Sequence, residues 1–374
     1  MTMIACTLNS GFPIIHADLL ISGEEGSSEF YVPAFADNLM DLLPAERDLH
    51  PVALQQKVYI VTDRICFAFA GKVWYATKFL EDLRTRCAIT QEITHSEIYE
   101  FLSEYARELD SDEFSFFLIY MNRVEGGFEA IPYVVGKWVE KEIPLFGKMY
   151  LLGTGANDFI AAAEYVDQTR SSVPTTPSEA VQSNMALVSM ILAKERIDPT
   201  TFLNHWGAGI ETVWFDGNRF TNLEQVTFVF NHWDLNAQNA FGYPTPTKFT
   251  NYFYTSDSLF ILDIEAKKGR TKVSGETIFV ECDHDNLEIR FFVVQSIESR
   301  EDASGEDYKD KRSFESTSVG MCYIIARGPQ IFTPGEFRGR RDAKIEFQYG
   351  NGLKIEIARH LYENVASIIK EMNL

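Results

Sequence analysis

The pattern of apolar and polar positions predicts alternating strands and helices over the first two-thirds of the chain. Apolar runs typical of strands, several of them paired through short turns, cover residues 3–9, 12–22, 57–71, 114–123, 127–136, 149–155 and 209–220. Apolar residues spaced three or four apart predict helices over 73–86, 156–170 and 178–197. Thr94 to Glu97 has the form of a capping box, which predicts a further helix through 98–109. This order suits helices packed on both outer faces of two stacked sheets.

Two stretches depart from this pattern and define the predicted domain organisation. Residues 24–56 are polar and punctuated by Pro, so we expect an inserted surface segment. After about residue 224, strand-like runs dominate until a helical stretch at 358–372. We therefore predict an α+β protein of two domains. Residues 1–223 carry the alternating elements and the insertion, and residues 224–374 form a mainly-β domain of sandwich type that ends in a helix.

Composition narrows the class of protein and its partners. The 374 residues are 45% hydrophobic, which is typical of a globular protein with sizeable cores. A net charge of −20 argues against nucleic acid and against anionic membranes as partners. No apolar run reaches the length of a membrane span, and the N-terminus lacks the pattern of a signal peptide. Five scattered cysteines without a CxxC pair indicate a reducing compartment, so we expect a cytoplasmic protein.

The stretch Cys282–Asp285 (CDHD) contains residue types that bind metals. Successive residues of a strand or turn point in alternate directions, so these side chains cannot all converge on one ion. Dinucleotide-binding and P-loop motifs are absent from the sequence. We therefore expect neither a metal nor a cofactor.

Thr2 stands directly behind the initiator Met, ahead of an apolar stretch. Removal of Met1 is favoured when the second residue is small, and Thr2 would then be the N-terminal residue. Such a Thr carries a nucleophile and a general base together, because an α-amine has a pKa of about 7.7–8.0 and is partly neutral near pH 7. A Thr at this position has no significance alone, so its interpretation depends on matches further along the chain.

Three stretches resemble proteasome β-type subunits and the bacterial HslV peptidase, in that family's order. TMIACTLNSGFPIIHAD places Asp18 sixteen residues after Thr2, as in the family. KVYIVTDRICFAFAG places Lys57 fourteen residues before Gly71, which is the spacing of the family's Lys and Gly. In YLLGTGAN, Thr154 stands where the family has Ser in a Gly-Ser-Gly turn. The resemblance covers residues 2–222 and implies a four-layer αββα Ntn-hydrolase (proteasome-like) sandwich.

The resemblance also implies a threonine-type peptidase or amidohydrolase. Thr2 would attack an amide or peptide carbonyl, Lys57 would stabilise its deprotonated hydroxyl, and Asp18 would hold Lys57. The backbone N–H of Gly71 would form the oxyanion hole, and Thr154 would hydrogen-bond near the amine of the nucleophile. Plainer interpretations stay open for three of these residues. Asp18 could be an ordinary acid in a turn, Lys57 a solvated Lys at the start of a strand, and Thr154 a loop hydroxyl.

The same resemblance assigns pocket and supporting positions, and here the chain departs from the family. Ser22 and Phe69 would line the substrate pocket, and the Phe69 ring predicts a shallow pocket for small apolar side chains. Where the family has an Asp and a Ser that support the nucleophile, this chain has Asn204 and Gly207. Asn204 can hydrogen-bond but carries no charge, so we expect weaker activation of the amine.

These departures leave two functions open. The first is a hydrolase that acts on a peptide or protein substrate, and the alternative is a catalytically weak or inactive proteasome-fold protein for assembly or binding. Family members commonly form rings, so the resemblance implies a homo-oligomer. The domain after residue 224 could block ring closure, recruit a partner or deliver substrate.

Overall fold

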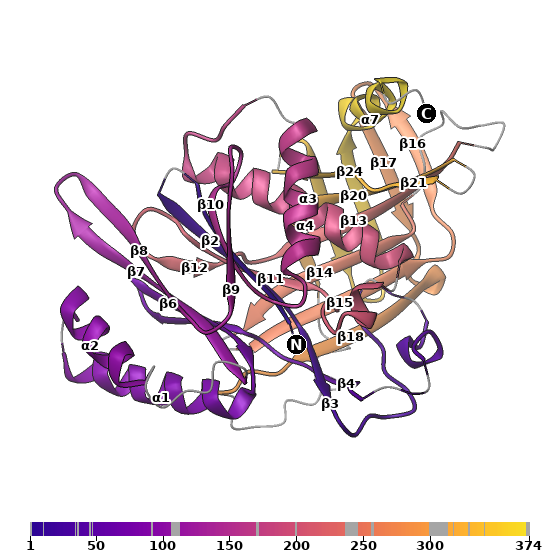
Figure 1. The fold of residues 1–374 in the computed structure, drawn as a ribbon. Helices are drawn as coiled ribbons and strands as arrows, with labels where there is room; N and C mark the ends of the chain where they lie inside the picture. The colour runs from indigo at the N-terminus through magenta and orange to yellow at the C-terminus, as the bar shows by residue number, and fades with distance from the viewer. Residues whose placement is uncertain are drawn as a thin grey trace.

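A computed structural model of the chain shows a mixed α/β fold in which antiparallel sheets dominate (Figure 1). The predicted mixture of helices and strands is therefore confirmed. Among the described residues, no helix is both long and apolar enough to cross a lipid bilayer. The structure describes the chain except for residues 1, 10, 34, 36, 45, 47, 91–92, 106–112, 170–171, 199, 236–245, 256–257, 299–312, 317, 328–329, 340 and 372–374.

Two antiparallel sheets stack face to face in the N-terminal part. Among the described residues, one is six-stranded with the order β12-β11-β2-β1-β10-β9, and the other is four-stranded with the order β5-β6-β7-β8. The first contains β1 (Met3–Asn9), β2 (Phe12–Asp18), β9 (Trp138–Ile143), β10 (Gly147–Gly153), β11 (Ile210–Phe215) and β12 (Phe220–Asn222). The second contains β5 (Val58–Thr62), β6 (Ile65–Gly71), β7 (Phe114–Val124) and β8 (Gly127–Val135).

The alternation of side chains along β1 explains how the sheets stack. Ile4 and Cys6 pack into the core between the two sheets, with residues of the four-stranded sheet such as Phe117. Met3 and Ala5 point the other way, into a second core beneath helices. Because β1 is apolar on both faces, it lies in the middle of the sheet rather than at an edge.

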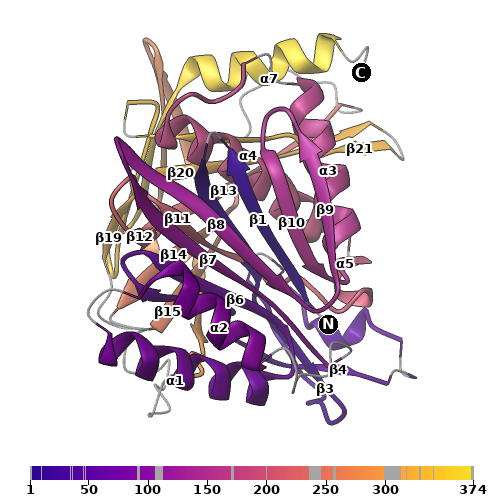
Figure 2. The same cartoon turned by 60° about the vertical axis from the view of Figure 1, so that its left-hand side comes forward.

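Helices cover the two outer faces of this pair of sheets (Figure 2). On the four-stranded sheet, α1 buries Phe79 and α2 buries Phe101. Thr94 N donates to Glu97 Oε2 at 2.7 Å and Glu97 N donates to Thr94 Oγ1 at 3.3 Å, so the predicted capping box is confirmed. The helices are α1 (Val73–Ile89) and α2 (His95–Tyr105) on this sheet, and α3 (Ala156–Thr169), α4 (Pro177–Ile197) and the short α5 (Thr200–Leu203) on the six-stranded sheet's side.

The segment 24–56 is not a loose surface insertion. After β2 ends at Asp18, the chain continues as β3 (Leu20–Gly23), which pairs with β4 (His50–Leu54). Val32 and Leu39 in the segment are 0% exposed and join the core beneath the six-stranded sheet. The prediction of a surface segment is therefore wrong at these positions, because the few apolar side chains of a polar stretch are those that pack.

The described residues of the C-terminal part form two further sheets and a helix. One sheet contains β13 (Val226–Asp234), β14 (Lys248–Thr255), β15 (Ser258–Ala266), β18 (Leu287–Val294), β20 (Ser318–Arg327), β21 (Gln330–Phe332) and β22 (Gly335–Arg338). The other contains β16 (Arg270–Ser274), β17 (Thr277–Cys282), β19 (Phe314–Ser316), β23 (Ala343–Gln348) and β24 (Gly352–Ala358). Apolar side chains of both sheets and of α7 (Arg359–Glu371) form one core.

Helix α4 connects the two parts of the molecule. It packs under the six-stranded sheet on one side, and on the other it contacts β20 and β22 closely: Ser189 Oγ donates to Glu336 O at 3.2 Å, and a Cβ built on Gly335 would lie 2.3 Å from Ala186 O. The predicted boundary at 223–224 falls between β12 and β13, yet one hydrophobic core extends across it, including Leu187 of α4 and Phe228 of β13.

Candidate active site

Thr2, Asp18 and Lys57 meet in one buried cluster, where the start of β1 and the end of β2 lie beside the start of β5. Lys57 Nζ donates hydrogen bonds to Thr2 Oγ1 at 2.6 Å and to Asp18 Oδ1 at 2.7 Å. Thr2 Oγ1 itself donates to Asp18 Oδ1. None of the three residues is more than 1% exposed. The interpretations of Asp18 as an ordinary turn acid and of Lys57 as a solvated Lys are therefore wrong.

The Lys57 ammonium has all three of its N–H donors occupied, because Nζ also donates to Leu20 O at 2.7 Å. Burial lowers the pKa of Lys57, and the neighbouring Asp18 carboxylate opposes this shift. A buried ammonium is costly unless it is paired and fully hydrogen-bonded. Asp18 and the Leu20 carbonyl together satisfy this requirement and fix Nζ against Thr2 Oγ1.

Backbone amides hold the Asp18 carboxylate from several directions. Its Oδ1 accepts from Met3 N at 2.8 Å, and its Oδ2 accepts from Gly207 N at 3.0 Å and from Leu20 N at 3.3 Å. Gly207 therefore contributes to the cluster through its backbone. This network leaves Asp18 little freedom to rotate, so it orients both Lys57 and the Thr2 hydroxyl.

Gly71 lies beside Thr2 at a cavity of about 380 Å³. Phe69 N donates to Lys57 O on the β5 side of β6, whereas Lys72 N donates to Glu113 O on the β7 side. Because N–H groups alternate along a strand, the Gly71 N–H faces away from β7, past the start of β5. Besides Thr2, Gly71 and Thr154, the cavity is lined by Ala70, Glu113, Phe114, Ser115, Lys137, Trp138, Val139, Leu151 and Gly153.

Gly71 adopts a backbone conformation that only Gly adopts readily. Its φ is +110°, and a Cβ at this position would lie 2.1 Å from Glu113 O. The backbone conformation at the end of β6 therefore requires a Gly at position 71.

Thr154 and Asn204 make contact, but not in the way the resemblance implies. Thr154 Oγ1 donates to Asn204 O at 2.6 Å and, more weakly, to Thr2 O at 3.5 Å. Asn204 is an exposed residue that takes part through its main-chain carbonyl. Thr154 is thus a tether between the residues that follow α5 and the start of β1, rather than a plain loop hydroxyl.

The two predicted pocket residues do not line this cavity. Phe69 is 1% exposed and its ring stacks on Phe67 in the core between the four-stranded sheet and α1, because alternation along β6 turns it away from the cavity that Ala70 lines. The prediction that Phe69 floors this pocket is therefore wrong. Ser22 lies on β3, and its buried Oγ has no hydrogen-bond partner within the described part of the chain.

Two buried carboxyls near the cluster are missed by the sequence patterns. Glu211 on β11 accepts at Oε1 from Lys57 N and from Val58 N, the latter at 3.0 Å. Glu195 on α4 accepts at Oε1 from Ala208 N at 3.1 Å. Burial raises the pKa of each carboxyl to about 8. For Glu211 the available signal is a Glu inside a mainly apolar strand, GIETVWF, whereas Glu195 lies between Lys194 and Arg196 in MILAKERI and its sequence gives no such signal.

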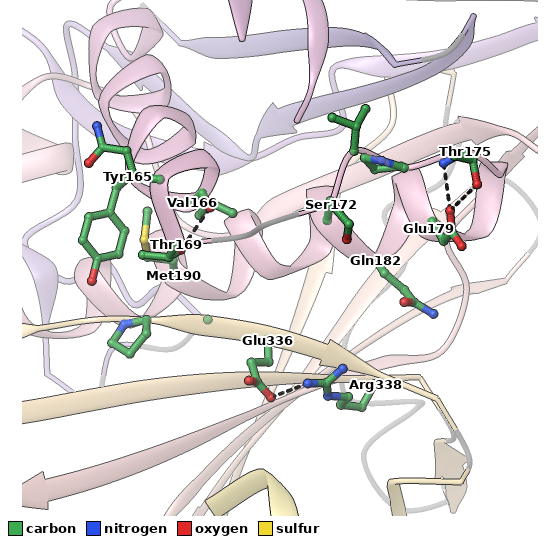
Figure 3. Close-up of a pocket in the computed structure, with 16 residues that line it drawn as sticks. Tyr165, Val166, Thr169, Ser172, Thr175, Glu179, Gln182, Met190, Glu336 and Arg338 are labelled. Atoms are coloured by element: carbon green, nitrogen blue, oxygen red, sulfur yellow. Dashed lines mark hydrogen bonds and ion pairs between the residues drawn. The ribbon is translucent and has the colours of Figure 1, made fainter. Parts of the chain in front are cut away.

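The other cavities that the described residues form include a groove, an apolar pocket beside Trp206 and a small pocket at Tyr252, and none of these three is lined by a predicted site residue. A groove of about 860 Å³ lies between α3, α4 and β22, where Glu336 pairs with Arg338 and Thr175 contacts Glu179 (Figure 3). Among the described residues, no group of three or more His, Cys, Asp or Glu side chains is arranged to hold a metal ion. The sequence matches no known protein-family model and no curated protein.

Proposed function

We propose that this chain is a threonine-type N-terminal-nucleophile hydrolase that cleaves peptide or amide bonds. The observation that carries this proposal is the hydrogen bond from Lys57 Nζ to Thr2 Oγ1 inside a buried ion pair with Asp18. We assign the N-terminal part to the four-layer αββα Ntn-hydrolase architecture of proteasome-like proteins. The two stacked sheets between α1–α2 and α3–α4 support that assignment.

In the proposed reaction, Thr2 Oγ1 bonds to the substrate carbonyl carbon while its proton passes to the α-amine that removal of Met1 leaves free. The amine then gives this proton to the leaving nitrogen as the C–N bond breaks, and an ester forms on Thr2. Water hydrolyses the ester with the amine again acting as the base.

Lys57 and Gly71 stabilise opposite parts of the proposed transition state. The Lys57 ammonium, 2.6 Å from Thr2 Oγ1, favours the negative charge that develops on this oxygen. A cation so close also lowers the pKa of the new amine, which keeps more of it neutral near pH 7. The N–H of Gly71 receives the carbonyl oxygen as it becomes an oxyanion.

The cavity beside Thr2 suggests the class of substrate. Its lining includes the apolar residues Trp138 and Val139, and its volume of about 380 Å³ is in the range of ligand sites. These walls suit a peptide with an apolar side chain next to the scissile bond. We retain a homo-oligomer and a partner bound through the C-terminal part as proposals from the family resemblance.

The second candidate function is a proteasome-fold protein with weak or no catalysis. It is favoured by Asn204, which contacts Thr154 only through its carbonyl, and by Gly207, which has no side chain to support an amine. The two candidates differ in one property, the reactivity of Thr2.

Intact-mass measurement and covalent labelling test this property. We expect the purified protein to lack Met1, and a β-lactone or epoxyketone probe to label Thr2. Thr2→Ala should abolish labelling and the hydrolysis of fluorogenic peptides, whereas Thr2→Ser, which keeps a hydroxyl, should retain both. Retention of Met1, or unchanged labelling of Thr2→Ala, would exclude Thr2 as the nucleophile.

A further inference from the structure

Residues 207–209, the active-site loop, lead into β11 and hold Asp18 in place. Gly207 N donates to Asp18 Oδ2 at 3.0 Å, and Gly207 O accepts from the amides of Leu19 and Leu20, both at 3.1 Å. All three loop residues have positive φ: 119° at Gly207, 66° at Ala208 and 100° at Gly209. Ala208 rarely adopts such a conformation by itself, so its surroundings must hold it.

Glu195 reaches this loop from the last turn of α4. Its side chain is 0% exposed, and its Oε1 accepts from Ala208 N at 3.1 Å. A Cβ built on Gly207 would lie 2.7 Å from Glu195 Oε2. The Glu195 carboxyl therefore lies where a side chain at position 207 would project. In the family that this chain resembles, the corresponding position is a Ser.

Tyr252 encloses the active-site loop from another direction. This residue lies on β14, in the part of the chain after residue 224, and it is 4% exposed. A Cβ built on Gly209 would lie 2.4 Å from the Tyr252 hydroxyl oxygen. The seven-stranded sheet thus contacts the loop directly, so the loop lies between α4 and a sheet of the C-terminal part.

We propose that Glu195 is a positioning residue of the active site, which holds the active-site loop through Ala208 N and thereby keeps Asp18 aligned with Lys57 and Thr2. This inference rests on the proposed function, because alignment of Asp18 has a catalytic consequence only if Thr2 reacts. Glu195 is not among the residues that line the cavity, and its Oε1 accepts from Ala208 N of the loop. Its effect therefore reaches the nucleophile only through the loop and Asp18.

Three variants separate this role from general packing. Glu195→Ala removes the acceptor, and Glu195→Gln keeps a carbonyl oxygen that can accept from Ala208 N. Thr201→Val is the matched control, because Thr201 is 3% exposed and its Oγ1 lies 3.3 Å from a Cβ built on Gly207, yet this oxygen has no hydrogen-bond partner within the described residues. The kcat and KM of peptide hydrolysis are measured together with amide hydrogen exchange at residues 18–20 and 207–209.

We expect Glu195→Ala to lower kcat by roughly tenfold to a hundredfold, since small misplacements of a reacting group cost about this much. KM should change by less than about threefold, because Glu195 does not line the substrate cavity. Glu195→Gln should stay within about threefold of the wild type in kcat, and the kcat of Thr201→Val should equal that of the wild type. Amide exchange in the loop should accelerate in Glu195→Ala alone.

The inference is overturned if Glu195→Ala keeps the wild-type kcat, or if Glu195→Gln and Thr201→Val lose as much as Glu195→Ala. If the wild type shows no Thr2-dependent hydrolysis, the proposed function fails, and the exchange data still decide the structural claim. Faster exchange of the loop in Glu195→Ala alone would support the role of Glu195 in holding Asp18. Unchanged exchange would overturn it.

Discussion

Lys57 Nζ lies 2.6 Å from Thr2 Oγ1, although the two residues are 55 positions apart in the chain. The contact depends on Asp18, which pairs with Lys57 and accepts from the Thr2 hydroxyl. A cation, an anion and a hydroxyl are thus held together without solvent. Breaking this buried ion pair should lower the free energy of unfolding, and it should also lower the reactivity of the Thr2 hydroxyl. Both effects can be measured.

Lys57→Met should destabilise the protein strongly. Removing one partner of a buried ion pair leaves the other charge uncompensated, which costs about 3–5 kcal/mol in the free energy of unfolding. Urea unfolding of the variant measures this loss. Thr2-dependent hydrolysis should fall by at least about a hundredfold, because the proposed reaction loses the cation that stabilises negative charge on Thr2 Oγ1.

Lys72→Met is the matched control for this prediction. Lys72 pairs with Glu113, but their side chains are 60% and 36% exposed, so water replaces the partner when the pair is broken. We expect a far smaller change in unfolding free energy than for Lys57→Met. Equal losses in the two variants would contradict the special status of the buried pair.

Gly71→Ala should reduce both stability and activity. The φ of +110° and the approach of Glu113 O leave no room for a Cβ, so β6 must shift at the residue whose amide we propose for the oxyanion hole. We expect a loss of about 2 kcal/mol or more in unfolding free energy, measured by urea unfolding. Gly217→Ala is the control for backbone strain alone, because Gly217 has a φ of +103° but nothing lies within 4 Å of a Cβ built there. The difference between the two variants measures the steric clash at Gly71. Only Gly71→Ala should lose hydrolysis.

The family resemblance is what predicts Asp18, Lys57 and Gly71 as site residues, and the structure places each of them at the end of a strand or directly before one. The resemblance does not predict Glu195 or Glu211, since their placement depends on how α4 and β11 pack against distant segments. Period-two alternation in WVEKEI is too weakly apolar to predict β9. The spacing of apolar residues in α4 predicts a helix, but it does not predict that β20 and β22 pack on its second face.

Thr154→Val should weaken the link between the start of β1 and Asn204. The variant loses the 2.6 Å bond to Asn204 O, which corresponds to about 1 kcal/mol in the free energy of unfolding. Thr2 should then react more slowly with a covalent probe, because the neighbouring chain is less fixed. Thr154→Ser keeps the hydroxyl and should behave as the wild type in both measurements. A Thr154→Val variant with wild-type labelling kinetics would argue against any role for this hydroxyl.

The two buried carboxyls predict how stability depends on pH between about 6.5 and 8. Burial raises the pKa of Glu195 and of Glu211 from 4.5 to about 8, so in this range the folded protein retains protons that the unfolded chain has released. The stability that each protonated carboxyl contributes is fully present below pH 4.5 and is lost as the pH rises through 8. The thermal unfolding midpoint should therefore fall by a few degrees over this window, because each of the two carboxyls loses about 1–2 kcal/mol of stabilisation.

The charged groups around Glu195 and Glu211 decide which variants can test this pH dependence. Asp18 raises the pKa of both carboxyls, Lys57 lowers that of Glu211, and Tyr252 faces Glu195. Glu211→Gln cannot release a proton, and its amide oxygen can still accept from Lys57 N, so the fall between pH 6.5 and 8 should become shallower. Gln at the exposed Glu125 should leave the profile unchanged, because that carboxylate stays hydrated on folding. If Glu211→Gln keeps the full wild-type slope, Glu211 is already ionised in the folded protein, and the cluster around Lys57 carries one more negative charge than we infer.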